Sequence, residues 1–232
     1  MPGTLYIVAT PIGNLEDITF RALRVLKKVD LILAEDTRVS KKLMMHYDIK
    51  TPIKSYYQHS SEERKLEILE RLESGENIAL VTDAGTPGIS DPGNELIDFI
   101  LERSDKQSLS LRGRIPVVPI PGASAITTAL SVSGLPMSKF LFLGFFPKKK
   151  RLKLIKLIKL TKLPIVFYES PYRILKTLEF LEEKLGGDRG VFIARELTKL
   201  HETLYRGMLS EVRGQLEKAK IKGEIVVLVE MN

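Results

Sequence analysis

Residues 78–93, with the sequence Ile78-Ala-Leu-Val-Thr-Asp-Ala-Gly-Thr-Pro-Gly-Ile-Ser-Asp-Pro-Gly93, join a short apolar run to a loop rich in glycine and proline. The run Ile78–Val81 predicts a buried strand. Glycine permits a positive φ and lets the backbone approach a ligand, whereas proline fixes its own φ and restricts the residue before it. The stretch therefore predicts a strand that leads into a stiff loop, which fits either a small-molecule site or an ordinary turn.

Two other segments have the same form. Leu5-Tyr-Ile-Val-Ala9 precedes Thr10-Pro-Ile-Gly-Asn14, and Ile115-Pro-Val-Val-Pro119 precedes Ile120-Pro-Gly-Ala-Ser124. In an open α/β sheet, ligands bind beyond the carboxyl ends of the strands, where such loops gather. We therefore expect the three loops to lie together and to form a ligand site.

Strand-like and helix-like segments alternate over the first half of the chain, which predicts a mostly parallel sheet. In the second half several strand-like segments follow one another more closely, so we expect a mixed sheet there. We predict an α/β protein of two domains, residues 1–116 and 117–232. Within these domains, Asp17 is expected to cap one helix, and Ser170 with Pro171 to begin another.

The formal net charge of +7 is concentrated in one segment, since residues 148–162 contain seven lysines and Arg151 but no acidic residue. A helical projection places four of the lysines opposite an apolar arc, with two leucines straying into the basic arc. The four lysines are Lys149, Lys153, Lys156 and Lys159, and the apolar arc consists of Leu154, Ile155, Leu157 and Ile158. The two leucines that fall within the basic arc are Leu152 and Leu160. Contact with RNA phosphates, a solvated helix face and, less readily, membrane insertion all fit this pattern.

Composition and missing motifs set several function classes aside. The chain has no cysteine, and His46, His59 and His201 are too scattered for a zinc motif, so we expect no metal. No apolar run approaches the ~20 residues of a membrane span, and no signal peptide is evident, so we expect a cytoplasmic protein. Phosphate-binding and dinucleotide-binding glycine motifs are missing, and the three loops carry no lysine or arginine. A nearly neutral ligand, such as an adenosine that carries an amino acid, fits these loops best.

Seven segments spread along the chain resemble the ribosomal RNA small-subunit methyltransferase I family, a branch of the tetrapyrrole methylase superfamily. They are TPIGNLEDITFRAL, AEDTRVSKKLM, VTDAGTPGISDPG, PIPGASAITTALSVSGLP, FYESPYRI, RELTKLHET with Arg206-Gly207, and KGEIVVLVE. The resemblance implies S-adenosylmethionine as methyl donor, a cleft between the two α/β domains, and a homodimer. It also implies methyl transfer to the ribose 2′-hydroxyl of a cytidine in the decoding region of 16S ribosomal RNA, within the small ribosomal subunit.

Carried over position by position, the resemblance implies two sets of residues that line the cofactor. The first set is Pro11, Ile12, Gly13, Asn14, Asp83, Gly85, Thr86, Pro87, Gly88, Ile89, Ser124 and Ala125. The second-domain set is Tyr168, Glu169, Glu196, Leu197, Gly223 and Glu224.

A ribose hydroxyl is a weak nucleophile that a positioned base would activate. Glu35, Asp36 and Asp83 are the candidate carboxylates, and the sequence selects none of them, so catalysis by positioning alone stays open. Asp36 also fits the N-cap of a helix. Arg38 and Arg173 are candidates to hold phosphate, together with the lysines of residues 148–162.

Two other functions fit the same residues. One is a methylase that acts on a tetrapyrrole or another small molecule, and the other is a non-catalytic protein that binds the ribosome. Many members of the family continue beyond the last strand into a small helical segment. We expect the lysine run 148–162 to contact the ribosomal subunit in its place.

Overall fold

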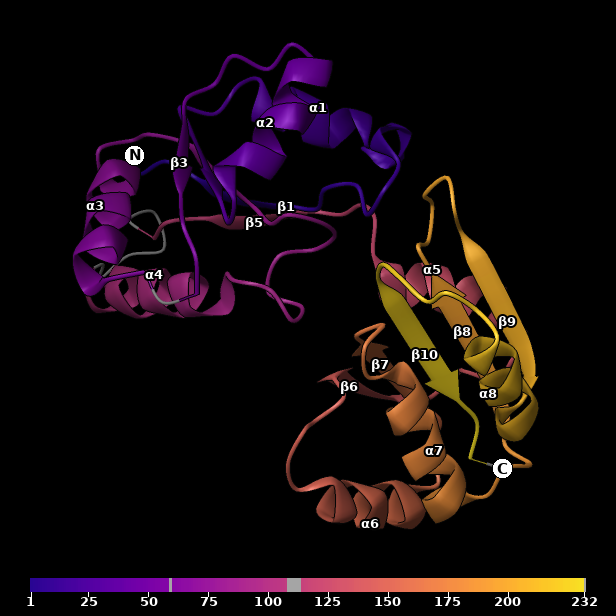
Figure 1. The fold of residues 1–232 in the computed structure, drawn as a ribbon. Coiled ribbons are helices and arrows are strands. Elements are labelled where there is room, and N and C mark those ends of the chain that lie inside the picture. The colour runs from indigo at the N-terminus through magenta and orange to yellow at the C-terminus, as the bar shows by residue number, and fades with distance from the viewer. Residues whose placement is uncertain (59, 108–113, 232) are drawn as a thin grey trace. The chain divides into compact units, whose positions relative to one another are not determined.

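The computed structural model describes residues 1–58, 60–107 and 114–231, and the chain forms two compact units, Met1–Ser124 and Ala125–Asn232 (Figure 1). The boundary lies later than the expected one after residue 116. The reason is that strand β5 (Val117–Ile120) pairs with β1 (Leu5–Val8) and so belongs to the first sheet.

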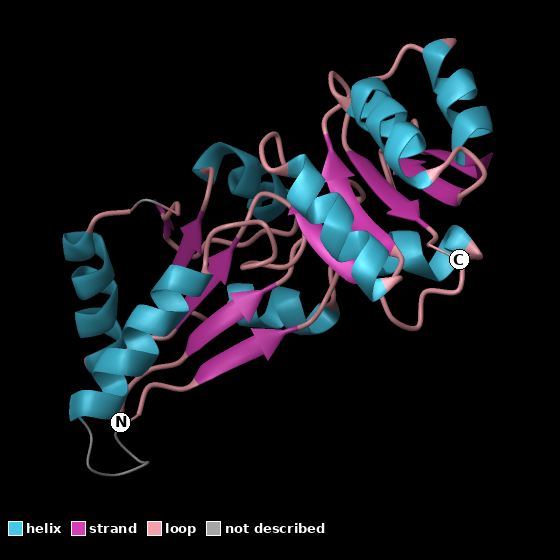
Figure 2. Ribbon diagram, turned by 90° about the horizontal axis from the view of Figure 1, so that it is seen from below, coloured by secondary structure: helices cyan, strands magenta, loops and turns pink. Residues whose placement is uncertain are grey.

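The first unit holds a five-stranded sheet in the order β3-β2-β4-β1-β5. Its remaining strands are β2 (Leu31–Ala34), β3 (Ile53–Ser55) and β4 (Ile78–Val81). Every neighbouring pair is parallel, and the arrows of this sheet point the same way in Figure 2. The predicted parallel sheet is therefore confirmed. Strand β3 was not predicted, because its three residues contain one apolar side chain and show no alternation.

Helices cover both faces of this sheet. On one face lie α1 (Phe20–Leu26) and α2 (Thr37–His46), which share a core with Val8 and Ile32. On the other face lie α3 (Glu62–Glu73) and α4 (Asn94–Gln107), which share a core with Leu5 and Leu33 (Figure 1). The expected cap Asp17 was wrong. It lies in the short 3-10 helix η1 (Leu15–Asp17), and α1 is capped by Thr19, whose hydroxyl accepts the Ala22 N–H.

The second unit holds a five-stranded sheet in the order β6-β7-β10-β8-β9. Its strands are β6 (Leu141–Phe145), β7 (Ile165–Glu169), β8 (Gly190–Arg195), β9 (Thr203–Met208) and β10 (Ile225–Val229). Strands β6 and β7 are parallel, whereas β10 runs antiparallel to β7 and β8, and β9 antiparallel to β8. The predicted mixed sheet is confirmed.

Four helices complete the second unit. Helix α5 (Ala125–Ser133) packs against β8 and β10, and a separate core joins the sheet to α6 (Arg151–Thr161), α7 (Ile174–Leu185) and α8 (Leu209–Glu217). Helix α7 begins later than predicted. The Ser170 hydroxyl instead accepts the Tyr172 N–H within a turn that precedes the helix. No helix in the described part of the chain is long and apolar enough to cross a membrane.

Candidate active site

The loops after β1 and β4 are joined by an isolated antiparallel bridge between Thr10 and Gly85. The Thr10 N–H donates to the Gly85 carbonyl at 2.9 Å, and the Gly85 N–H donates to the Thr10 carbonyl at 3.0 Å. The buried Thr10 hydroxyl also donates to the Thr82 carbonyl at 3.1 Å. Because these bonds link two loops through backbone groups, the two loops form one unit at the carboxyl edge of the sheet.

The loop after β5 joins the same group. The Thr86 hydroxyl donates to the Ala123 carbonyl at 3.3 Å. A Cβ on Gly122 would lie 3.1 Å from the Ala9 Cβ, so this glycine allows the backbones of the two loops to approach closely. The expectation that the three Pro/Gly loops lie together is confirmed.

Glycine conformation keeps the β4 loop in place. Gly85 and Gly88 have φ values of +84° and +85°, which side chains other than glycine rarely adopt. The Asn94 side-chain amide donates to the Gly88 carbonyl at 2.9 Å, and a Cβ on Gly88 would lie 2.5 Å from Asn94 Oδ1. Backbone groups and small side chains therefore dominate this edge of the sheet.

The three candidate carboxylates lie beside these loops and differ in environment. Asp83 Oδ1 accepts the Asp36 N–H at 3.0 Å, which ties the end of β2 to the end of β4. Burial raises the pKa of Glu35, and the negative charges of Asp83 and Asp36 raise it further, although the Asp83 backbone N–H partly offsets the rise. Burial and the neighbouring carboxylates thus move the pKa of Glu35 upward, toward neutrality.

Asp36 has a structural role. Its side chain caps α2 by accepting the Arg38 N–H at 2.8 Å, and its carboxylate also accepts from the Arg38 guanidinium, at 2.6 Å for the shortest contact. The hydrogen bonds from Arg38 hold the pKa of Asp36 at about 2. Asp36 therefore stays ionised, and Arg38 has an acidic partner.

In the second unit, the strand register brings together motifs that are far apart in the sequence. Ile225 of β10 lies opposite both Glu169 of β7 and Arg195 of β8. Just beyond this row, Glu196 Oε1 accepts the Glu224 N–H at 2.9 Å. The predicted cofactor residues of this unit, from Tyr168 to Glu224, thus lie together at one end of the strands β7, β8 and β10.

The Glu196 side chain crosses over Gly223. A Cβ on Gly223 would lie 2.2 Å from Glu196 Cδ, so this position requires glycine. Glu196 itself has a φ of +54°, an uncommon value for a residue with a side chain. Lys199 Nζ bonds Glu196 Oε1 at 2.9 Å and Glu224 Oε2 at 3.0 Å. Sequence reasoning missed Lys199, although its position three residues after Glu196 in RELTKLHET could have indicated the pair.

Comparison with known proteins identifies the family. Residues 4–213 match the family model Tetrapyrrole (Corrin/Porphyrin) Methylases. The chain is 49% identical over 232 residues to the ribosomal RNA small subunit methyltransferase I of Halalkalibacterium halodurans, covering 99% of this chain and 76% of that protein. It is 50% identical over 228 residues to the protein of the same name from Thermotoga maritima, covering 98% of each. The chain belongs to the ribosomal RNA small subunit methyltransferase I family.

Two solved structures with the same fold are named as methyltransferases. The methyltransferase CobJ superposes with a TM-score of 0.71 at 18% identity, covering 99% of this chain and 94% of that chain. Uroporphyrin-III C-methyl transferase from Thermus thermophilus, complexed with S-adenosylhomocysteine, superposes with a TM-score of 0.64 at 18% identity, covering 99% and 98%. These likenesses establish the tetrapyrrole methylase fold, and the predicted family and fold class are confirmed.

Two other residues predicted for this methyltransferase have internal partners. The Glu169 carboxylate is fully buried and accepts from Thr177 Oγ1 and from the Ser170 N–H, each at 2.7 Å. Arg173 Nη2 lies 3.3 Å from Glu169 Oε2 and donates to the Phe146 carbonyl at 2.7 Å. Both side chains therefore hold the second unit together, and the Arg173 guanidinium has partners other than a phosphate.

The lysine-rich helix α6 presents its lysines to solvent. Of the apolar arc that the helical projection gave, Ile155 and Ile158 are buried, whereas the side chain of Leu157 is 47% exposed. Leu152 and Leu160 are exposed among the lysines, as the projection indicated. In the part of the chain that the structure describes, no acidic side chain pairs with Lys149, Lys153, Lys156 or Lys159.

The structure also bears on metal binding. Among the described residues, which exclude His59, no group of histidine, aspartate and glutamate could hold a metal ion.

Proposed function

We propose that this methyltransferase transfers a methyl group from S-adenosylmethionine to the ribose 2′-hydroxyl of a cytidine in the 16S RNA of the small ribosomal subunit. The names of the relatives that are about half identical support this substrate. The observation that carries the proposal is the bonding of the β1, β4 and β5 loops to one another beside Glu35. The acceptor nucleotide is taken from the family resemblance.

The β1, β4 and β5 loops are the proposed binding site for the adenosyl amino acid. Their backbone N–H and C=O groups can hydrogen-bond a nearly neutral ligand, and they contain no lysine or arginine that would favour a phosphate instead. The residues of this set run from Pro11 to Asn14, from Asp83 to Ile89, and through Ser124 and Ala125. In the second unit the proposed contacts are Tyr168, Leu197 and the backbone near Glu196 and Gly223. When bound, S-adenosylmethionine supplies an activated methyl group on a sulfonium.

Glu35 is the proposed general base. It lies at the carboxyl end of β2, beside the loop that carries Asp83, and its raised pKa suits a group that accepts a proton near neutral pH. Asp36 and Asp83 position this site, because Asp83 accepts the Asp36 N–H and Asp36 caps α2. Orientation of the two reactants would supply much of the remaining acceleration.

The exposed lysines of α6 are proposed to contact RNA phosphates, which attract lysine independently of sequence. The family resemblance leads us to propose a homodimer as well. The relatives are named for ribosomal RNA, which supports a cytoplasmic location.

The test offers labelled S-adenosylmethionine with three acceptors, namely purified small ribosomal subunits, naked 16S RNA and a tetrapyrrole. The proposal predicts label in RNA and none in the tetrapyrrole. Label in the tetrapyrrole would favour the alternative function of a small-molecule methylase. That alternative is considered because the chain matches the family model of corrin and porphyrin methylases. Binding of subunits without any label transfer would indicate a non-catalytic ribosome-binding protein.

A further inference from the structure

The first unit carries a second basic surface, on the face of its sheet that α1 and α2 cover. Seven exposed cations belong to these two helices and to the residues directly after α1. They are Arg21, Arg24, Lys27, Lys28, Arg38, Lys41 and Lys42. Neither α1 nor α2 contains an acidic residue. We call these seven residues the α1–α2 surface.

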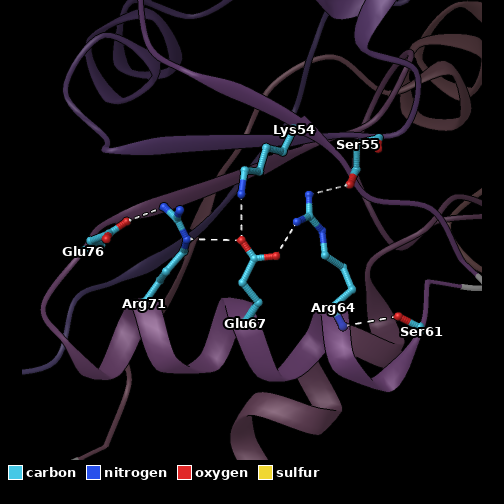
Figure 3. Close-up of polar contacts among 7 residues, drawn as sticks. All are labelled: Lys54, Ser55, Ser61, Arg64, Glu67, Arg71 and Glu76. Carbon is cyan, nitrogen blue, oxygen red and sulfur yellow. Dashed lines mark hydrogen bonds and ion pairs between the residues drawn. The ribbon is translucent and has the colours of Figure 1, made fainter.

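On the opposite face of the same sheet, the cations of α3 and of the described part of α4 have acidic partners. Glu67 of α3 pairs with Lys54, Arg64 and Arg71, as Figure 3 shows. Two further ion pairs, Lys65–Glu95 and Arg103–Glu62, link α3 to α4. These cations hold helices and strand together, so they are poorly placed to bind another molecule.

The α1–α2 surface differs in that six of its seven cations have no acidic partner in the described part of the chain. The exception is Arg38, which pairs with Asp36. An exposed cation without an acidic partner forms no ion pair that would stabilise its own domain, so ion pairing within the unit does not explain this set. A polyanionic partner does.

The position of α2 relates this surface to the candidate base. Helix α2 begins directly after Glu35 and Asp36, and residues three and four apart on a helix share one face. Arg38, Lys41, Lys42 and Met45 fall on such a face, and all four are exposed. A line of positive charge therefore runs along α2 away from the carboxylates.

The same surface exposes two large apolar side chains. Phe20, at the first residue of α1, is 92% exposed and precedes Arg21, while Met45 is 81% exposed in the last turn of α2. Aromatic side chains among cations are typical of surfaces that bind unpaired nucleotides, because each base presents a face on which a ring can stack.

We propose that the α1–α2 surface binds the RNA strand that flanks the modified nucleotide, with its lysines and arginines on phosphates and Phe20 against a base. The proposal rests on the proposed function, since it takes ribosomal RNA as the polyanion. It gives the protein a second RNA-contact region besides α6. This second region lies on the unit that carries the candidate base.

The test compares two triple variants with the same change in charge. The first, K28E/K41E/K42E, alters the α1–α2 surface. The second, K176E/K218E/K220E, alters three exposed lysines of the second unit that have no acidic partner among the described residues. For each variant, filter binding to naked 16S RNA is measured over a series of salt concentrations, and S-adenosylmethionine binding is measured by calorimetry.

The first variant is expected to bind RNA roughly ten-fold or more weakly, and to lower the slope of log affinity against log salt concentration by about 2, because each phosphate contact contributes nearly one to that slope. Its affinity for S-adenosylmethionine is expected to stay unchanged. The second variant is expected to bind RNA almost normally. Equal losses in both variants, or no loss in the first, would overturn the inference.

Two further measurements distinguish a failure of the proposed function from a failure of the surface proposal. Wild-type protein that transfers no label to RNA would refute the proposed function, whereas full RNA binding by K28E/K41E/K42E would refute the surface alone. Vesicles that contain anionic phospholipid are tested in parallel. Wild-type binding to vesicles but not to RNA, lost in the first variant, would mean that the surface serves a membrane and not a nucleic acid.

Discussion

Gly85 and Thr10 donate to each other's carbonyls, at 3.0 and 2.9 Å, and Gly85 does so with a φ of +84°. The added Cβ of alanine at position 85 would lie 3.5 Å from Ile12 Cγ2 and 3.9 Å from the Ala123 carbonyl oxygen, both ordinary contacts, so its cost comes from the backbone conformation. We expect Gly85→Ala to lower the free energy of unfolding by about 1–2 kcal/mol and to weaken S-adenosylmethionine binding measured by calorimetry.

The control for this variant is Gly134→Ala. Gly134 has a φ of +72° and no neighbour within 4 Å of an added Cβ, so it carries a similar conformational cost away from the loops. It is expected to lose stability and to keep its affinity for S-adenosylmethionine. Equal affinity losses in both variants would show that the loop geometry is not specific to the ligand.

Replacing Glu35 by glutamine tests the proposed base. Transfer of label to RNA is expected to fall by on the order of 10²–10⁴-fold, while S-adenosylmethionine affinity stays the same. A general base must be ionised, so the wild-type rate should rise with pH through the pKa of Glu35, which lies above its ordinary 4.5. The variant should lack this rise.

Asp36→Asn is the matched variant, because asparagine also caps helices well and removes a carboxylate one residue away. It is expected to retain much more activity than Glu35→Gln. If the two variants lose the same activity, or if Glu35→Gln keeps the wild-type pH profile, Glu35 does not act as the base.

Reversing three lysines of α6, in K153E/K156E/K159E, tests the predicted RNA contact of this helix. All three are exposed, and Ile155 and Ile158, which anchor the helix, are untouched. We expect weaker binding of small ribosomal subunits with a shallower salt dependence, and unchanged S-adenosylmethionine binding. K176E/K218E/K220E again serves as control. Unchanged methylation of subunits by the α6 variant would remove α6 from the RNA-binding surface.

Arg173→Ala distinguishes a structural arginine from one that binds phosphate. Its removal leaves the fully buried Glu169 carboxylate without a cation, which is expected to lower the free energy of unfolding by about 3 kcal/mol. Lys176→Ala, in the helix α7 that Arg173 precedes, should have little effect, since Lys176 is exposed and has no acidic partner in the described chain. Normal stability of Arg173→Ala together with weaker RNA binding would restore the original prediction of phosphate contact.

The ion pairs around Glu67 make the free energy of unfolding depend on pH. Hydrogen bonding from Lys54 contributes most to holding the pKa of Glu67 at about 2, below its ordinary 4.5. Because the pKa is depressed in the folded state, this stabilisation is complete above pH 4.5 and is lost as the pH falls toward 2. Glu67→Gln should therefore be less stable than wild type at pH 7 by about 1 kcal/mol or less. In urea unfolding the difference should close on acidification, and a difference that persists at pH 2 would contradict this assignment.

The sequence predicted the loops better than the side-chain partners. Three strand-to-loop transitions were enough to place the loops together, because parallel strands bring their carboxyl ends to one edge. The bond between Asp36 and Asp83 and the burial of Glu169 against Arg173 depend on geometry between elements, which periodicity does not encode. For that reason Arg173 was predicted as a phosphate ligand.

Element ends show a similar limit. Ser170 and Pro171 are typical of a helix start, but they form the turn before α7. The N-cap of α1 is Thr19 and not Asp17. The α1–α2 surface was also missed, because its cations are spread over two helices whose proximity appears only in the fold, whereas the lysines of α6 stand in one run. A net charge summed along the chain does not reveal such a surface.

The most direct test of the central claim is nucleoside analysis by mass spectrometry of 16S RNA after incubation of small subunits with this protein and labelled S-adenosylmethionine. The account predicts label in one nucleoside, 2′-O-methylcytidine. Label on a base, or label in the control without protein that equals the sample, would contradict it.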